Sequence, residues 1–151
     1  MMSLPHYLSI PKSGSGPGVL VLHSWWGLNA FFKGLCDRFA EAGFLALAPD
    51  LYAGKVASTV AGAKKLRAEA TASRREPAYR MLMRAIDRLS RHEKVTQPHI
   101  ALVGFSMGGH WGVVVGSAAG TSRCGNRHFL CGPERRFHSE PFAVSLSLRR
   151  R

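Results

Sequence analysis

Three short apolar runs, separated by segments with helical periodicity, constrain the fold of this chain more than any other feature. The runs occupy residues 19–22, 44–48 and 100–103 and are apolar at every position. Such runs are typical of strands that are covered on both faces in a parallel sheet. Because strands that alternate with amphipathic helices form βαβ units with right-handed crossovers, we expect an α/β fold built on a parallel sheet.

The segments between these runs carry the helix signals. Asn29 can cap a helix whose apolar residues recur at 3.6-residue spacing until Gly43. Residues 58–75 are helix-prone and basic, and Pro77 suits the first turn of a further helix. One apolar stripe follows it: Ala78, Met81, Leu82, Ala85, Ile86 and Leu89. Cys36 lies on the apolar face of the first helix, and we interpret it as a core residue because burial raises the pKa of a thiol.

The third apolar run leads directly into the pattern G-x-S-x-G at Gly104–Gly108. A sharp turn from strand to helix holds a serine hydroxyl clear of the backbone and close to N–H donors, and flanking glycines permit that turn. We therefore predict that Ser106 is a nucleophile. The N–H of Met107, at the start of the helix, would face the acyl oxygen that gains negative charge. The chemistry implied is acyl transfer, most simply the hydrolysis of an ester.

A second segment is expected at the same edge of the sheet. The turn His23–Gly27 follows the first apolar run, and catalytic groups in parallel sheets gather at the carboxyl ends of the strands. His23 could contact the site from this turn, or it could hydrogen-bond to nearby backbone. The turn His23–Gly27 and the turn at Ser106 are thus expected side by side at the same edge of the sheet.

Three segments together resemble the dienelactone hydrolase family of α/β-hydrolases. They read Val19-Leu-Val-Leu-His-Ser-Trp-Trp-Gly-Leu-Asn29, Leu45-Ala-Leu-Ala-Pro-Asp-Leu-Tyr52 and Gly104-Phe-Ser-Met-Gly-Gly109. The resemblance covers about residues 15–120 and implies a parallel-sheet α/β-hydrolase fold, a small carboxylic ester or lactone as substrate, and no cofactor. It also implies that the N–H of Trp25 is a second oxyanion donor, paired with that of Met107.

The chain departs from the name-giving enzymes of that family at two positions. Ser106 stands where those enzymes carry a cysteine nucleophile, and Ser24 stands where they carry a glutamate that contacts the thiol. The substrate class expected from the resemblance is therefore loosened toward general esters and lactones.

None of the motifs specifies the catalytic acid or the base. The family places both after two later strands, which are not visible here, so residues 1–120 are expected to form only the N-terminal part of an α/β-hydrolase domain. Glu134 with His138 follows Ser106 in the order serine, acid, histidine, but no strand separates the pair. His110 is a rival base, although a residue four positions beyond Ser106 can instead cover the side of its own helix. The general base and acid stay open.

The sequence changes character after Gly120. Residues 121–140 contain no Lys, Asp, Ile, Met or Tyr and show no clear period, which indicates a truncated or frame-shifted end. We expect a basic, irregular tail over residues 121–151. If later strands are missing, residues 100–103 form an exposed sheet edge that promotes self-association, unless the tail or a second copy covers it.

The remaining side-chain chemistry of the tail does not predict a metal site. Thiolates and imidazoles are ligands of zinc, but the spacing of the cysteines and histidines in the tail fits none of the common zinc patterns. The set comprises Cys124, His128, Cys131 and His138.

Charge and composition test the other classes of function. The net charge of +12 suits nucleic acid, but the last 31 residues alone carry seven Arg against two Glu, and no nucleic-acid-binding motif accompanies them. We therefore expect a solvated basic surface without a nucleic-acid partner. The sequence contains no run of 18 apolar residues, so it predicts no membrane span. Its three cysteines are odd in number and scattered, which suits a reducing, cytoplasmic compartment.

Two alternatives to a serine hydrolase remain open. The first is a non-catalytic fragment or pseudoenzyme, because the sequence specifies a nucleophile and an oxyanion hole without a base. The second is a basic module whose Arg-rich tail binds nucleic acid or an anionic membrane surface.

Overall fold

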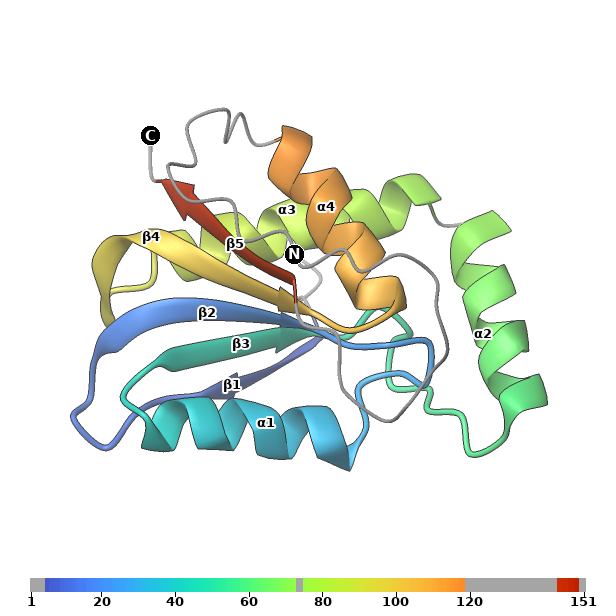
Figure 1. Cartoon of the computed structure of the whole chain (residues 1–151), viewed down its shortest axis with the longest axis horizontal. Coiled ribbons are helices and arrows are strands. Elements are labelled where there is room, and N and C mark those ends of the chain that lie inside the picture. Colours follow the sequence, from blue (N-terminus) through green and yellow to red (C-terminus); the bar gives the residue numbers. More distant parts are fainter. Residues whose placement is uncertain (1–4, 73–74, 119–143, 150–151) are drawn as a thin grey trace.

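The computed structural model describes residues 5–72, 75–118 and 144–149, and Figure 1 shows how their helices and strands are arranged. The elements in chain order are β1 (His6–Ser9), β2 (Gly16–Leu22), α1 (Ala30–Glu41), β3 (Leu45–Pro49), α2 (Val60–Ala72), α3 (Arg75–Ser90), β4 (Val95–Gly104), α4 (Met107–Ala118) and β5 (Val144–Arg149). Within the described residues the strands form one sheet in the order β1-β3-β2-β4-β5.

The centre of the sheet is parallel, as the apolar runs predict. β2 pairs in parallel with β3 on one side and with β4 on the other. Leu20 of β2 lies opposite Leu47 of β3 and Leu102 of β4, and all three side chains are buried. In a strand that is covered on both faces, apolar and polar residues do not alternate, because every side chain is buried. This explains the unbroken apolar runs. The expected α/β fold is confirmed.

Helices cover the two faces of this sheet (Figure 1). α1 packs on one face against β2 and β3, and α3 and α4 lie on the other face. Cys36 of α1 is fully buried, and burial raises the pKa of its thiol to about 12. The interpretation of Cys36 as a core residue is therefore confirmed.

β5 is the main departure from the fold expected for the tail. It pairs antiparallel with β4, with Val144 opposite Gly104 and Arg149 opposite His99. The expectation of an irregular tail is therefore wrong for residues 144–149, and β4 is not an exposed edge. A physical reason lies in the sequence, because Val-Ser-Leu-Ser-Leu alternates with the period of two that suits an edge strand. Residues 121–143 and 150–151 of the expected tail lie outside the described residues.

Glycine makes the closest approach between α4 and the sheet. A Cβ atom on Gly108 would collide with the backbone carbonyl oxygens of Leu22 and His23. No side chain can therefore replace the hydrogen at this position while α4 stays seated on the end of β2. This contact holds the first turn of α4 beside the two central parallel strands.

We expect Gly108→Ala to lower the free energy of unfolding by about 2–3 kcal/mol, because the added methyl group must push α4 away from β2. Urea-induced unfolding of the purified variant measures this loss.

Gly112→Ala is the matched control on the same helix. A Cβ at Gly112 meets only the Leu22 side chain, at an ordinary 3.7 Å, and Ala is favoured over Gly inside a helix by about 1 kcal/mol. The control should therefore be at least as stable as the parent. Equal stability of the two variants would contradict the packing argument.

Candidate active site

Ser106 lies in the turn that joins β4 to α4. Its backbone φ is 52°, in the left-handed region that costs a residue other than glycine about 1–2 kcal/mol. The turn is tight, because a Cβ on Gly104 would collide with the backbone of Gly108. Ser106 is nevertheless exposed. The sequence of strand, glycine, strained serine and helix therefore presents the hydroxyl at the carboxyl end of the parallel sheet.

The first turn of α4 lies directly behind this hydroxyl. The N–H of Gly108 donates to the Phe105 carbonyl at 2.9 Å, and the N–H of His110 donates to the Ser106 carbonyl at 3.1 Å. Within residues 5–72, 75–118 and 144–149, no backbone hydrogen bond engages the N–H of Met107. A free N–H at a helix N-terminus carries partial positive charge, so this group can stabilise an anion.

The loop after β2 lies next to the elbow, the turn over Gly104–Gly108 that joins β4 to α4. Leu22, the last residue of β2, pairs with Gly104, and its carbonyl accepts a hydrogen bond from the N–H of Phe105 at 3.2 Å. In this loop the Ser24 carbonyl accepts from the N–H of Gly27 at 3.1 Å. No backbone acceptor among the described residues binds the N–H of Trp25. Two unengaged N–H groups thus lie at the carboxyl ends of adjacent strands.

His23 is a structural histidine in this loop. Its ring is fully buried, its Nδ1 donates to the Ser24 carbonyl at 2.7 Å, and its Nε2 accepts from the N–H of Leu51 at 3.1 Å. Burial lowers the pKa of His23 from its ordinary value. Of the two roles left open for His23, the structure therefore shows hydrogen bonding to nearby backbone, and neither ring nitrogen is available as a general base.

The candidate bases are not joined to Ser106. His110 is exposed on α4, and its ring lies edge-on to the neighbouring Trp111 at 6.2 Å between centroids. No hydrogen bond engages the Ser106 hydroxyl among the residues that the structure describes. Glu134 and His138 lie outside the described residues, as do the other members of the cysteine and histidine set in the tail. The general base stays a prediction.

Tyr52 is a residue of the site that the sequence argument missed. It follows β3, and its hydroxyl donates to the sulfur of Met107 at 3.2 Å. Its ring lies edge-on to His23 at 5.1 Å, and burial raises the pKa of its hydroxyl to about 12. The available signal was its place directly after a buried parallel strand, at the edge where the elbow also lies.

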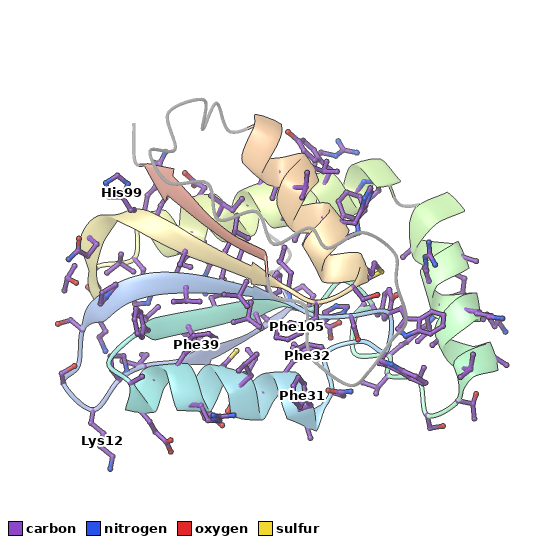
Figure 2. All side chains as sticks on the ribbon, viewed as in Figure 1. Lys12, Phe31, Phe32, Phe39, His99 and Phe105 are labelled. Atoms are coloured by element: carbon purple, nitrogen blue, oxygen red, sulfur yellow. The ribbon has the colours of Figure 1, made fainter. Side chains whose placement is uncertain are left out.

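Aromatic rings gather beside the elbow on the α1 face (Figure 2). Phe105 lies 5.5 Å from Phe32 and 6.1 Å from Phe31 between ring centroids. Phe31 is 59% exposed, so part of this cluster faces solvent. Such a surface can contact the apolar part of a small organic ligand.

A parallel strand that ends in a strained serine turn, here β4, beside the loop after the neighbouring strand β2, defines the class of α/β-hydrolases. The model of the dienelactone hydrolase family matches residues 4–123 of the chain. The chain therefore belongs to the dienelactone hydrolase family, as its three segments predicted.

Individual relatives agree with this membership. The chain is 38% identical over 106 residues to "Protein usf" of Aquifex pyrophilus and 34% identical over 106 residues to "Putative carboxymethylenebutenolidase" of Aquifex aeolicus. Each match covers 68% of this chain and 46% of the relative. The solved structure of m3DLH has a TM-score of 0.62 and 28% identity, over 74% of this chain and 48% of that one. The chain thus spans about half the length of the relatives it matches.

Two other features are absent from the part of the chain that the structure describes. Among the described residues, no group of three or more His, Cys, Asp and Glu side chains is placed to hold a metal ion. None of the described helices is long and apolar enough to cross a membrane.

The strain at Ser106 predicts a difference between two small substitutions. Ser106→Gly should be about 0.5–1 kcal/mol more stable than Ser106→Ala, because glycine adopts a positive φ without a steric penalty whereas alanine keeps the strain. Both variants lack the hydroxyl, so its loss cancels in the comparison. Thermal and urea unfolding measure the difference, and equal stabilities would show that the turn is unstrained.

Because burial lowers the pKa of His23, we expect the free energy of unfolding to depend on pH. Its folded pKa lies below the ordinary 6.5, so below that pH the unfolded chain binds a proton that the folded chain does not. The free energy of unfolding should therefore be highest above pH 6.5 and fall as the pH drops, by at most about 1.4 kcal/mol per pH unit for this group. Urea unfolding at several pH values measures the slope. His23→Gln should reduce it, and parallel profiles for the two proteins would refute the assignment.

Proposed function

We propose that this chain carries the nucleophile and the oxyanion hole of a serine hydrolase that acts on carboxylic esters or lactones. The observation that carries the proposal is an exposed serine with φ 52° at the same edge of the sheet as two backbone N–H groups, those of Trp25 and Met107, that no backbone acceptor among the described residues binds. Membership of the dienelactone hydrolase family supports it.

The chemistry follows from this arrangement. The hydroxyl oxygen of Ser106 attacks the carbonyl carbon of the substrate, and the carbonyl oxygen takes up negative charge. The N–H groups of Trp25 and Met107 donate to that oxygen, and each such donor contributes about 100- to 1000-fold in rate. The C–O bond to the alcohol part of the adduct then breaks, the departing oxygen takes up the proton that the Ser106 hydroxyl has lost, and the acyl group stays on Ser106. Water then hydrolyses this acyl group to the acid and restores the hydroxyl.

We expect small, partly apolar substrates. The aromatic cluster of Phe31, Phe32 and Phe105 can contact the apolar part of an ester. A relative from Aquifex aeolicus bears the name "Putative carboxymethylenebutenolidase", which supports lactones as candidate substrates here. In a lactone the released alcohol stays attached to the acyl group, so the product is a single hydroxy acid.

The base is the open part of the proposal. His110, and Glu134 with His138, remain its candidates, and without a base an oxyanion hole with substrate binding leaves about 1000-fold catalysis over water. A non-catalytic fragment or pseudoenzyme is the second candidate function, because the Ser106 hydroxyl has no hydrogen-bond partner among the described residues. A cytoplasmic location also stays a prediction.

A fluorophosphonate probe tests the nucleophile, because it phosphonylates an activated serine hydroxyl. The parent chain should be labelled once, and Ser106→Ala should not be labelled at all. Mass spectrometry of the intact protein gives the stoichiometry, and hydrolysis of p-nitrophenyl acetate should disappear in the same variant.

Ser90→Ala is the matched control. The Ser90 hydroxyl donates to the Asp87 carbonyl on α3 and has no part in the proposed site. Its variant should be labelled like the parent. A folded parent chain that resists the probe would overturn the proposed hydrolase and favour the non-catalytic fragment.

A further inference from the structure

The N–H of Trp25 and the carbonyl of Ser24 belong to one peptide group. A peptide group is planar, and in the trans form its C=O and N–H point in opposite directions. The described residues contain no cis peptide bond. Whatever fixes the direction of the Ser24 carbonyl therefore fixes the direction of the Trp25 N–H as well.

Two donors hold this carbonyl. The Nδ1 of His23 donates to it at 2.7 Å, and the N–H of Gly27 donates at 3.1 Å. The bond from His23 is the shorter one and comes from a fully buried ring. Donation to a carbonyl also polarises its peptide group, which makes the N–H on the other side a better donor.

The ring of His23 is itself held from its other side. Its Nε2 accepts from the N–H of Leu51, in the turn after β3, at 3.1 Å. Because that N–H can only donate, Nε2 carries no proton and Nδ1 carries the one that reaches Ser24. The ring is also packed edge-on to Tyr52. His23 thus links the turn after β3 to the Ser24–Trp25 peptide group, which follows β2.

We propose that His23 is a positioning residue for the oxyanion hole: its Nδ1–H holds the Ser24 carbonyl so that the Trp25 N–H faces the oxygen of the reacting ester. This inference rests on the proposed function, because it assigns the Trp25 N–H to that oxygen. His23 takes no proton from substrate or from Ser106. Its effect passes entirely through the Ser24–Trp25 peptide group.

Two substitutions separate the two hydrogen bonds of the ring. In His23→Asn the amide nitrogen stands as many bonds from Cα as Nδ1 does, so it can still donate to the Ser24 carbonyl. In His23→Gln the terminal amide reaches toward the Nε2 position and can still accept from the Leu51 N–H. Each variant loses one of the two bonds, so both should lose similar stability.

The rate of labelling by the fluorophosphonate probe distinguishes the two. We expect His23→Gln to react about 10- to 100-fold more slowly than the parent, and His23→Asn to stay within about threefold of it. Equal losses in both variants, no loss in either, or a larger loss in His23→Asn would overturn the proposal.

A second readout does not depend on the reactivity of Ser106. The ¹⁵N relaxation order parameter of the Trp25 amide should fall in His23→Gln and stay near the parent value in His23→Asn. An unchanged Trp25 amide in His23→Gln would overturn the positioning role. If the parent itself resists the probe, the proposed hydrolase fails, while the order parameters still decide whether His23 fixes this peptide group.

Discussion

The close backbone contact between α4 and the end of β2 is the constraint on which the rest of the site depends. Gly108 lies against the carbonyl oxygens of Leu22 and His23, at a separation that no side chain permits. This contact, together with the hydrogen bond from Phe105 to Leu22, holds the elbow in place. A strained residue such as Ser106 persists only where its surroundings fix the backbone so firmly.

The parallel sheet supplies that rigidity. β2 lies between β3 and β4 and is buried from Val19 to Leu22, so the ends of three strands have defined positions relative to one another. His23 is a polar ring at the end of this apolar strand. Its burial is tolerated because both nitrogens are hydrogen-bonded, and the bond from the Leu51 N–H ties the loop after β3 to the loop after β2.

β5 changes what lies next to the elbow. In the resemblance to dienelactone hydrolases, later strands continue the sheet beyond β4 and carry the acid and histidine. Here β5 lies at that edge and runs antiparallel, beginning beside Gly104 and ending beside His99. Its carboxyl end therefore lies at the edge of the sheet opposite to Ser106. A histidine delivered by the carboxyl end of a following parallel strand therefore has no counterpart in β5, so β5 adds no base to the proposed nucleophile Ser106.

Sequence by itself determined the parallel α/β fold, the family and the place of Ser106, because these depend on local patterns: unbroken apolar runs, helical spacing, and glycines around a serine. It left the role of His23 open and missed Tyr52, since each acts through partners about 30 to 55 positions away. The sequence left open whether the tail or a second copy covers the edge of β4, because a short alternating segment such as residues 144–149 does not reveal which edge it will join. Only the tertiary structure decided these points, since hydrogen bonds and strand pairs between distant segments depend on how the whole sheet brings them together.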